Sequence, residues 1–278
     1  MRALAQATLI LILAGCGAAP TVTRPATPIA SGTPAVRPTS LIFEPPFPLE
    51  PFLAIDGDLL AYTVESPQPG HPQANAIVVH NLATGADVTR IQTAESMWAL
   101  DLSGDNVIYS EGIQDQDGFY PNTRVMLAIG GANPIEIAKN GYEVAIDGQR
   151  LVWAQDKANT VSPFEDDQTV VTATISNLQP VQLSRQSTAS QVYQGYWPAA
   201  GEGLVSWHDM PVGAPGDELE IWDPQSGATV PIFDVGSLTV SGICGGWIGW
   251  QTSIESPPGS VFDAFYEAPI DAVKKLFQ

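Results

Sequence analysis

One of the two cysteines has the sequence environment of a catalytic thiol. Cys244 lies in Gly-Ile-Cys-Gly-Gly, which fits the G-x-C-x-G outline of a nucleophile elbow. A true elbow joins a strand to a helix in an α/β sheet and is followed along the chain by an Asp and a His. None of the three histidines, His71, His80 and His208, follows Cys244. The pattern favours a structural role for this cysteine, and no catalytic residue is assigned.

Metal chemistry has little support in the residue pattern. The histidines lack metal-ligand spacing, and the HExxH, CxxC and P-loop motifs are absent. The stretch Asp115-Gln116-Asp117-Gly118 is similar to a fragment of a calcium loop, but it lacks the first acidic residue and the distal Glu of an EF-hand. The sequence predicts no cofactor and no metal site, and calcium at this loop is the open alternative.

The composition indicates a folded and strongly acidic protein. Hydrophobic residues make up 44% of the 278 residues and charged residues 15%, which is enough apolar material for a packed core. The chain has 30 Asp and Glu against 11 Lys and Arg, a formal net charge of −19. Such a surface repels nucleic acid and anionic lipid headgroups, so nucleic acid is not expected as a partner.

The first residues, MRALAQATLILILAGC, have the features of a lipoprotein signal peptide. The apolar run is shorter than the roughly 20 residues of a bilayer span. The ending Leu13-Ala14-Gly15-Cys16 resembles the lipobox of bacterial lipoproteins. The resemblance implies removal of residues 1–15, lipidation of Cys16, and a membrane-anchored location in the cell envelope, outside the cytoplasm. The alternative is an ordinary secreted protein with a chance cysteine at this position.

Residues 16–47 form a linker rich in proline, threonine and alanine. Such a chain builds no core and extends as a semi-rigid spacer at about 3.1 Å per residue, which reaches up to roughly 100 Å. We therefore expect a tether that holds a folded domain, residues 48–278, away from the membrane.

The folded domain contains one short pattern five times. Each unit has an apolar stretch, a turn with Gly or Asp, and a strand that ends in an aromatic residue. The aromatic anchors are Tyr62, Tyr109, Trp153, Trp207 and Trp250. They are separated by between 43 and 54 residues, which is close to the period of propeller blades.

The repeat also places the cysteine. Six residues before each anchor stand Asp56, Ser103, Asp147, Gly201 and Cys244. Small polar residues at such a turn position serve local backbone hydrogen bonding. Cys244 is therefore predicted to mark the turn of a fifth unit.

Strand-like runs rich in Val, Ile and aromatic residues fill the rest of each unit. Tight turns separate them, for example Ala83-Thr84-Gly85, Ser226-Gly227 and Glu267-Ala268-Pro269. No segment has a convincing helical pattern. The sequence predicts an all-β fold, a β-propeller of five blades with four antiparallel strands each, with a six-bladed or incomplete ring as the alternative. Ring closure would protect the sheet edges.

Two segments, Val78 to Gly85 (VVHNLATG) and Glu220 to Gly227 (EIWDPQSG), carry a further likeness. They are similar to the strand and turn of TolB-like β-propeller repeat proteins of the bacterial envelope, and the resemblance covers about residues 50–278. This chain lacks the Ser-Pro-Asp-Gly turn of those proteins and has five units where six are common. The resemblance implies a propeller that works in the cell envelope.

The predicted loops between second and third strands all emerge on one face of a propeller, and most exceed hairpin length. They are rich in acidic residues, and aromatic residues precede each unit near the same face. Such a pairing could hold a sugar, a cationic peptide or, with calcium, a polyanion. The predicted ligand-binding residues are Asp115, Asp117, Glu165, Asp166, Asp167, Asp209, Asp217, Trp98, Tyr142 and Trp197. A simpler interpretation is that the acids are solvated loop residues and the aromatics pack between blades.

Two functions follow from this organisation. The first is a binding or scaffold module for an envelope protein or glycan. The alternative is a carbohydrate-active enzyme of the glycosidase type, which needs two carboxyl groups about 5 to 9.5 Å apart. Its candidates on the inner strands are Asp56, Asp101 and Asp147.

Overall fold

The computed structural model describes residues 52–113, 122–156, 168–185, 193–211, 218–232, 237–255 and 261–278. The side chains of 193–194, 210–211, 237–240, 252–255 and 261–265 are not described. The predicted signal peptide, Cys16 and the linker lie outside these residues.

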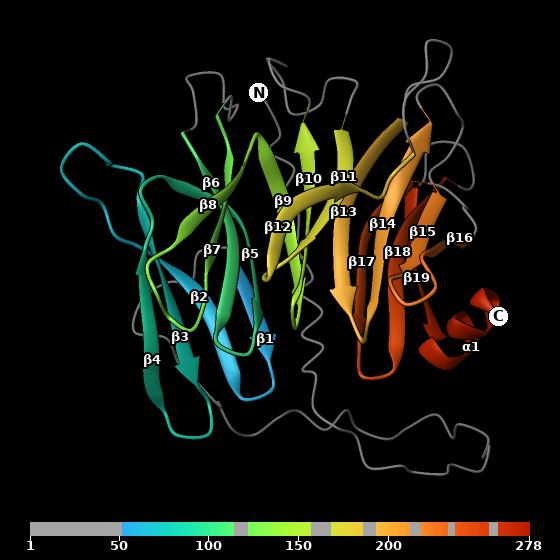
Figure 1. Ribbon diagram of the computed structural model, residues 1–278, viewed down its shortest axis with the longest axis horizontal. Coiled ribbons are helices and arrows are strands. Elements are labelled where there is room, and N and C mark those ends of the chain that lie inside the picture. The colour runs from blue at the N-terminus through green and yellow to red at the C-terminus, as the bar shows by residue number, and fades with distance from the viewer. Residues whose placement is uncertain are drawn as a thin grey trace.

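Five antiparallel sheets follow one another along the chain (Figure 1). The first contains β1 (Leu53–Asp56), β2 (Leu59–Glu65), β3 (Asn75–Asn81) and β4 (Ala86–Gln92), and the second β5 (Ser96–Ser103), β6 (Asn106–Gly112), β7 (Arg124–Ala128) and β8 (Ile135–Lys139). The third contains β9 (Gly141–Asp147), β10 (Arg150–Asp156), β11 (Gln168–Thr174) and β12 (Asn177–Gln182), and the fourth β13 (Tyr193–Gly201), β14 (Leu204–Pro211), β15 (Glu218–Asp223) and β16 (Ala228–Ile232). The fifth contains β17 (Ser237–Cys244), β18 (Trp247–Glu255) and β19 (Val261–Pro269).

The predicted five blades are confirmed, but the fifth differs from the other four. Its expected turn at Glu267-Ala268-Pro269 lies inside β19, and a short helix, α1 (Ile270–Lys274), and a 3-10 turn, η1 (Lys275–Phe277), replace the fourth strand. The helix forms here because Ile270 and Val273 share one face and are buried against the core between the fourth and fifth sheets. No helix among the described residues has the length and apolar character to cross a bilayer.

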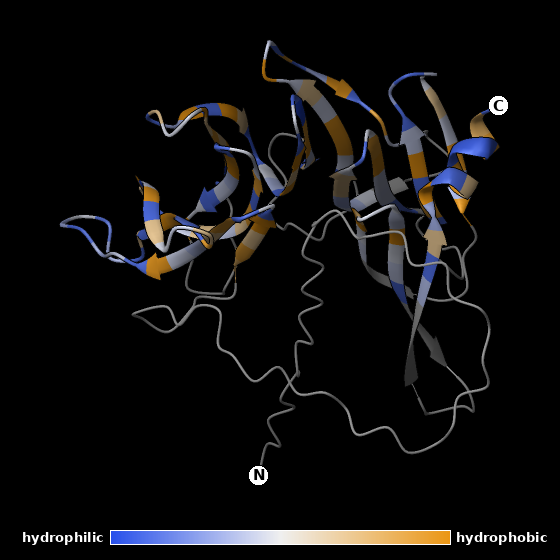
Figure 2. Cartoon of the chain, turned by 90° about the horizontal axis from the view of Figure 1, so that it is seen from below, coloured by the Kyte–Doolittle hydropathy of each residue, from blue (hydrophilic) through white to orange (hydrophobic). Residues whose placement is uncertain are grey.

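Three of the five aromatic anchors explain the repeat physically, because they pack between neighbouring sheets. Tyr109 is buried between the first and second sheets, Trp153 between the second and third, and Trp207 between the third and fourth. Aromatic side chains of this size contribute much of the apolar area that such a core removes from water. Figure 2 shows the sheets side by side, with hydrophobic residues concentrated on the strands.

Neighbouring blades are also joined by hydrogen bonds at the turn between their first and second strands. We call these the inter-blade turn bonds: Gly104 N donates to Asp56 Oδ2 (2.7 Å), Gly148 N to Ser103 Oγ (3.0 Å), Gly203 N to Asp147 Oδ2 (2.8 Å) and Gly246 N to Glu202 Oε1 (2.7 Å). The expected local bonding of these turn residues is therefore replaced by bonding to the next sheet. In the fourth blade Glu202 takes this role in place of Gly201, its neighbour in the turn. Cys244 lies at the corresponding end of β17, where β17 turns into β18.

The innermost strands β1, β5, β9, β13 and β17 contact one another in that order. Among the described strands, no contact of similar extent joins β17 back to β1. The first and fifth blades therefore stand at the two ends of an arc (Figures 1 and 2).

Candidate functional site

The end of the propeller at which the second strands finish is here called the loop end. There the second strand of each sheet connects to the third, over 66–74 in the first blade. Six of the predicted ligand-binding acids, Asp115, Asp117, Glu165, Asp166, Asp167 and Asp217, lie outside the described residues. Among the residues that are described, no three His, Cys, Asp or Glu side chains gather as a metal site. Calcium at Asp115 and Asp117 stays a prediction.

Each innermost strand from the second blade to the fifth contains a β-bulge near the loop end. The pairing register shifts around Trp98 in β5, Glu143 in β9 and Trp197 in β13, and again within β17. A bulge redirects the side chain of the extra residue and is common beside functional sites. Two of the predicted aromatic residues therefore stand at equivalent, redirected positions. Glu143 shares this position and was not predicted from the sequence.

Glu143 and Trp197 form a strained pair between the third and fourth blades. Both have left-handed backbone, with φ of 50° and 45°. Trp197 N donates to Glu143 Oε2 at 2.7 Å. Strained backbone of this kind costs on the order of 1 to 3 kcal/mol per residue and clusters at functional sites. The bond holds the Trp197 indole at the loop end with 40% of its surface exposed.

Burial raises the pKa of Glu143 to about 7, and the negative charge of Asp156 adds to the rise, while the bond from Trp197 N opposes it. A carboxyl group whose pKa is raised by folding stabilises the fold most below its ordinary pKa of 4.5. That contribution is lost as the pH rises through about 7.

Replacing Glu143 by Gln is therefore expected to flatten part of the pH dependence of stability. The glutamine oxygen can still accept the bond from Trp197 N, but the side chain no longer ionises. Melting temperatures measured from about pH 4 to about pH 8 should fall less in this variant than in the native protein. The matched control is Glu136→Gln, which removes a carboxylate on the strand β8. An unchanged slope in the Glu143 variant would contradict the prediction.

The other predicted aromatics differ in accessibility. Tyr142 is buried, and its hydroxyl donates to Asp156 Oδ1. Trp98 is partly exposed, and Trp197 packs edge-on against the His208 ring with the centroids 5.3 Å apart. Of the predicted aromatic residues, Trp98 and Trp197 therefore retain surface that a ligand could touch.

Asp209 is the one predicted acid that the structure describes, and it is fully buried. Its Oδ2 accepts a hydrogen bond from Arg185 N (3.3 Å) and lies 3.8 Å from Arg185 Nε. The same guanidinium donates to Glu218 and Glu220 at 2.5 Å each. Burial raises the pKa of Asp209 to about 6, and Arg185 opposes the rise. Asp209, on β14, thus fixes Arg185, which lies in the connection that follows β12.

Glu111 does the same for the connection between β4 and β5. It is 1% exposed, and its Oε2 accepts from Ala94 N (2.9 Å) and Glu95 N (3.3 Å). Its Oε1 accepts from Arg124 Nε at 2.9 Å. Glu111 and Asp209, which belong to the predicted acidic loops, are therefore buried residues that stabilise connections between strands.

The inner-strand carboxylates are also engaged. Asp56 and Asp147 accept the inter-blade turn bonds. Asp101 accepts from Leu102 N and from Ile146 N of the next blade, both at 2.8 Å. Burial raises the pKa of Asp101 to about 7, the two bonds oppose the rise, and the charges of Asp56 and Asp147 add to it. Each of the three carboxylates therefore links its own blade to the next one.

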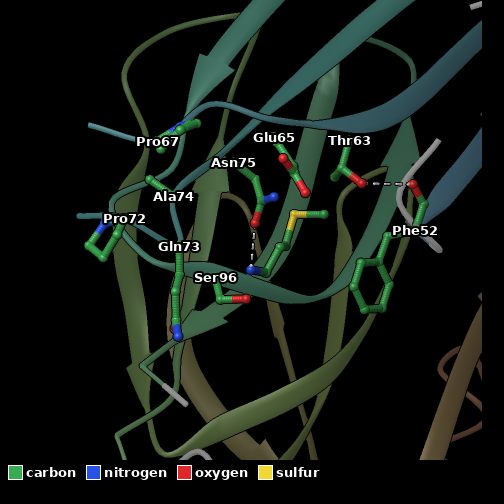
Figure 3. Close-up of a pocket in the computed structure, with 10 residues that line it drawn as sticks. Phe52, Thr63, Glu65, Pro67, Pro72, Gln73, Ala74, Asn75 and Ser96 are labelled. Carbon is green, nitrogen blue, oxygen red and sulfur yellow. Dashed lines mark hydrogen bonds between the residues drawn. The ribbon is translucent and has the colours of Figure 1, made fainter. Parts of the chain in front are cut away.

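A pocket opens at the loop end between the first and second blades (Figure 3). Its volume is about 340 Å³. It is lined by Phe52, Thr63, Glu65, Pro67, Pro72, Gln73, Ala74, Asn75, Ser96 and Met97. Two hydrogen bonds between a side chain and the backbone shape the wall. Thr63 Oγ1 donates to Phe52 O (3.5 Å), and Met97 N donates to Asn75 Oδ1 (3.1 Å). Met97, which lines the pocket, directly precedes the bulge residue Trp98.

No protein-family model matches the chain, and no curated protein matches it. Solved structures share its fold. An acylaminoacyl peptidase from Pyrococcus horikoshii has a TM-score of 0.53 and 11% identity, covering 79% of this chain and 38% of that one. An oligogalacturonate lyase in complex with manganese has a TM-score of 0.51 and 12% identity, covering 79% and 61%. A prolyl endopeptidase has a TM-score of 0.51 and 13% identity, covering 78% and 33%.

The chain is a five-bladed β-propeller. It spans less than two thirds of the length of each of these three proteins, and at such low identity the similarity concerns the fold alone. The similarity to two peptidases therefore assigns no reaction to the residues described above.

Proposed function

We propose that this protein is a binding or scaffold module that presents the loop end of its propeller to an envelope protein or a glycan. The pocket between the first and second blades carries the proposal, because it is a preformed concave site on a rigid scaffold. The accessible indole of Trp197 at the same end supports it.

The proposal includes the anchor. A lipidated Cys16 and the proline-rich linker 16–47 would hold the propeller outside the cytoplasm and away from the membrane surface. A tethered module of this kind meets partners within the reach of its linker.

The enzymatic alternative has weaker support. A glycosidase needs one carboxyl group free to protonate the leaving group and a second free to attack or to activate water. Asp56, Asp101 and Asp147 instead accept backbone hydrogen bonds that join neighbouring blades. Binding therefore fits the described residues better than glycoside cleavage.

Affinity capture from envelope extracts with the full chain tests the proposed function. The native protein is expected to retain a specific partner, and replacing Asp115, Asp117, Asp166 and Asp167 by Asn is expected to weaken its recovery. Asp58→Asn, a single charge change at the opposite end of the first blade, is the control. If the native protein retains no partner, the proposed binding function is wrong. If the fourfold variant recovers every partner, the acidic loops do not contribute to binding.

A further inference from the structure

Glu65 differs from Glu111 and Asp209, two other acids near strand ends at the loop end, because its carboxylate has no partner among the described residues. Glu111 is paired with Arg124 and Asp209 with Arg185, so the chain supplies a guanidinium to each. The backbone of Glu65 pairs with β3, but its carboxylate makes no hydrogen bond or ion pair with the residues that the structure describes. Its carboxylate is exposed and belongs to the pocket lining (Figure 3). Within the described part of the chain, this negative charge of the pocket has no counterion.

The rest of the lining selects against other ligand classes. Among the described residues that line the pocket, Glu65 is the one that carries a charge. An anionic ligand would meet repulsion from Glu65 and from a chain of net charge −19. A neutral sugar could use Gln73 and Ser96, because Thr63 Oγ1 and Asn75 Oδ1 already bond to backbone, but it would leave the charge of Glu65 without a counterion.

The walls of the pocket are mostly polar but also include apolar side chains. Phe52, Met97, Pro67 and Pro72 supply apolar surface around the carboxylate. The volume of about 340 Å³ is near the lower limit of small-ligand sites, which span roughly 300 to 1,000 Å³. Lysine and arginine side chains combine an apolar stem with a cationic head, and a cation also interacts favourably with an aromatic face such as that of Phe52.

We propose that this pocket accepts a lysine or arginine side chain from an extended peptide segment of a protein partner, with Glu65 as the counterion. The inference rests on the proposed binding function and specifies its ligand chemistry. The external side chain supplies at Glu65 what Arg124 and Arg185 supply at Glu111 and Asp209.

Calorimetric titration of the full chain with blocked tripeptides tests the assignment. The probes are N-acetylated and C-amidated Gly-Arg-Gly, Gly-Lys-Gly, Gly-norleucine-Gly and Gly-Glu-Gly, where norleucine keeps an apolar stem without the charge. Arginine and lysine peptides should bind at least about tenfold more tightly than the other two. Their affinity should fall as salt rises from about 0.05 M to about 0.5 M, because exposed charges are screened.

Two variants test whether Glu65 is responsible for the binding of the cationic peptides. Glu65→Gln keeps the shape of the side chain and should weaken the cationic peptides by about tenfold or more. Asp58→Asn removes one exposed carboxylate at the opposite end of the same blade and should leave binding unchanged. Melting curves of both variants establish that they are folded. Equal binding by native protein and Glu65→Gln, or no preference for the cationic peptides, would overturn the assignment.

The same variants separate this inference from the proposed function. If the native protein captures a partner from envelope extracts and Glu65→Gln captures it equally well, the cation assignment is wrong while the binding function stands. If Glu65→Gln loses the partner and Asp58→Asn retains it, the result supports both the cation assignment and the binding function.

Discussion

Replacing Glu111 by alanine is expected to lower the free energy of unfolding by about 3 to 5 kcal/mol. The side chain is 1% exposed and pairs with Arg124, with Oε1 2.8 Å from Nη2. Its other oxygen accepts two backbone N–H groups at the crossing from the first blade to the second. Alanine leaves these two donors and the guanidinium without their acceptor, and a buried polar group without a partner keeps its full desolvation cost.

Urea unfolding followed by tryptophan fluorescence measures this loss. The matched control is Glu136→Ala, because Glu136 Oε2 lies 3.9 Å from Arg124 Nη1 and is 38% exposed. An exposed pair of this kind is worth no more than about 1 kcal/mol. Equal losses in the two variants would show that burial of Glu111 does not govern its contribution.

Replacing Gly201 by alanine is expected to destabilise the contact between the fourth and fifth blades by about 1 to 3 kcal/mol or more. An added Cβ would lie 2.3 Å from the carbonyl oxygen of Ile243. That atom belongs to the backbone of β17, so relief requires a whole strand to move rather than one side chain to rotate.

Gly242→Ala provides the control, because a Cβ at Gly242 meets nothing within 4 Å. Thermal unfolding and near-ultraviolet circular dichroism should show a lower melting temperature and altered tryptophan signals for Gly201→Ala, and neither change for Gly242→Ala. A Gly201 variant with native stability would mean that the two sheets separate at little cost.

The architecture could be predicted because the repeat has a direct physical cause. Tyr109, Trp153 and Trp207 are large, buried and placed between successive sheets, so their spacing reports the length of a blade. The fifth blade could not be predicted in the same way. Its last segment is helical because Ile270 and Val273 are buried against the neighbouring sheet, and that surface exists only after folding.

The site was predictable in part. Trp98 and Trp197 were predicted because they lie near the connections from the fourth strand of one unit to the first strand of the next. The bulges that redirect them and the left-handed backbone of Glu143 leave no mark in the residue pattern. Asp209 fell in an acidic loop window, yet Arg185 reaches it across a sequence separation of 24 residues. Glu111 carried one visible signal, an arginine at the start of the following strand, because Glu111 and Arg124 are cross-strand partners.

The inter-blade turn bonds follow one rule at all four described joints. Every acceptor belongs to the preceding unit and every donor is a turn glycine of the following one. Removing the second unit as a whole would bring Asp56 to Gly148, and the pairing of an oxygen with a glycine N–H would be preserved. At this bond, a chain built on this rule can gain or lose whole blades by duplication and deletion and keep the same pairing.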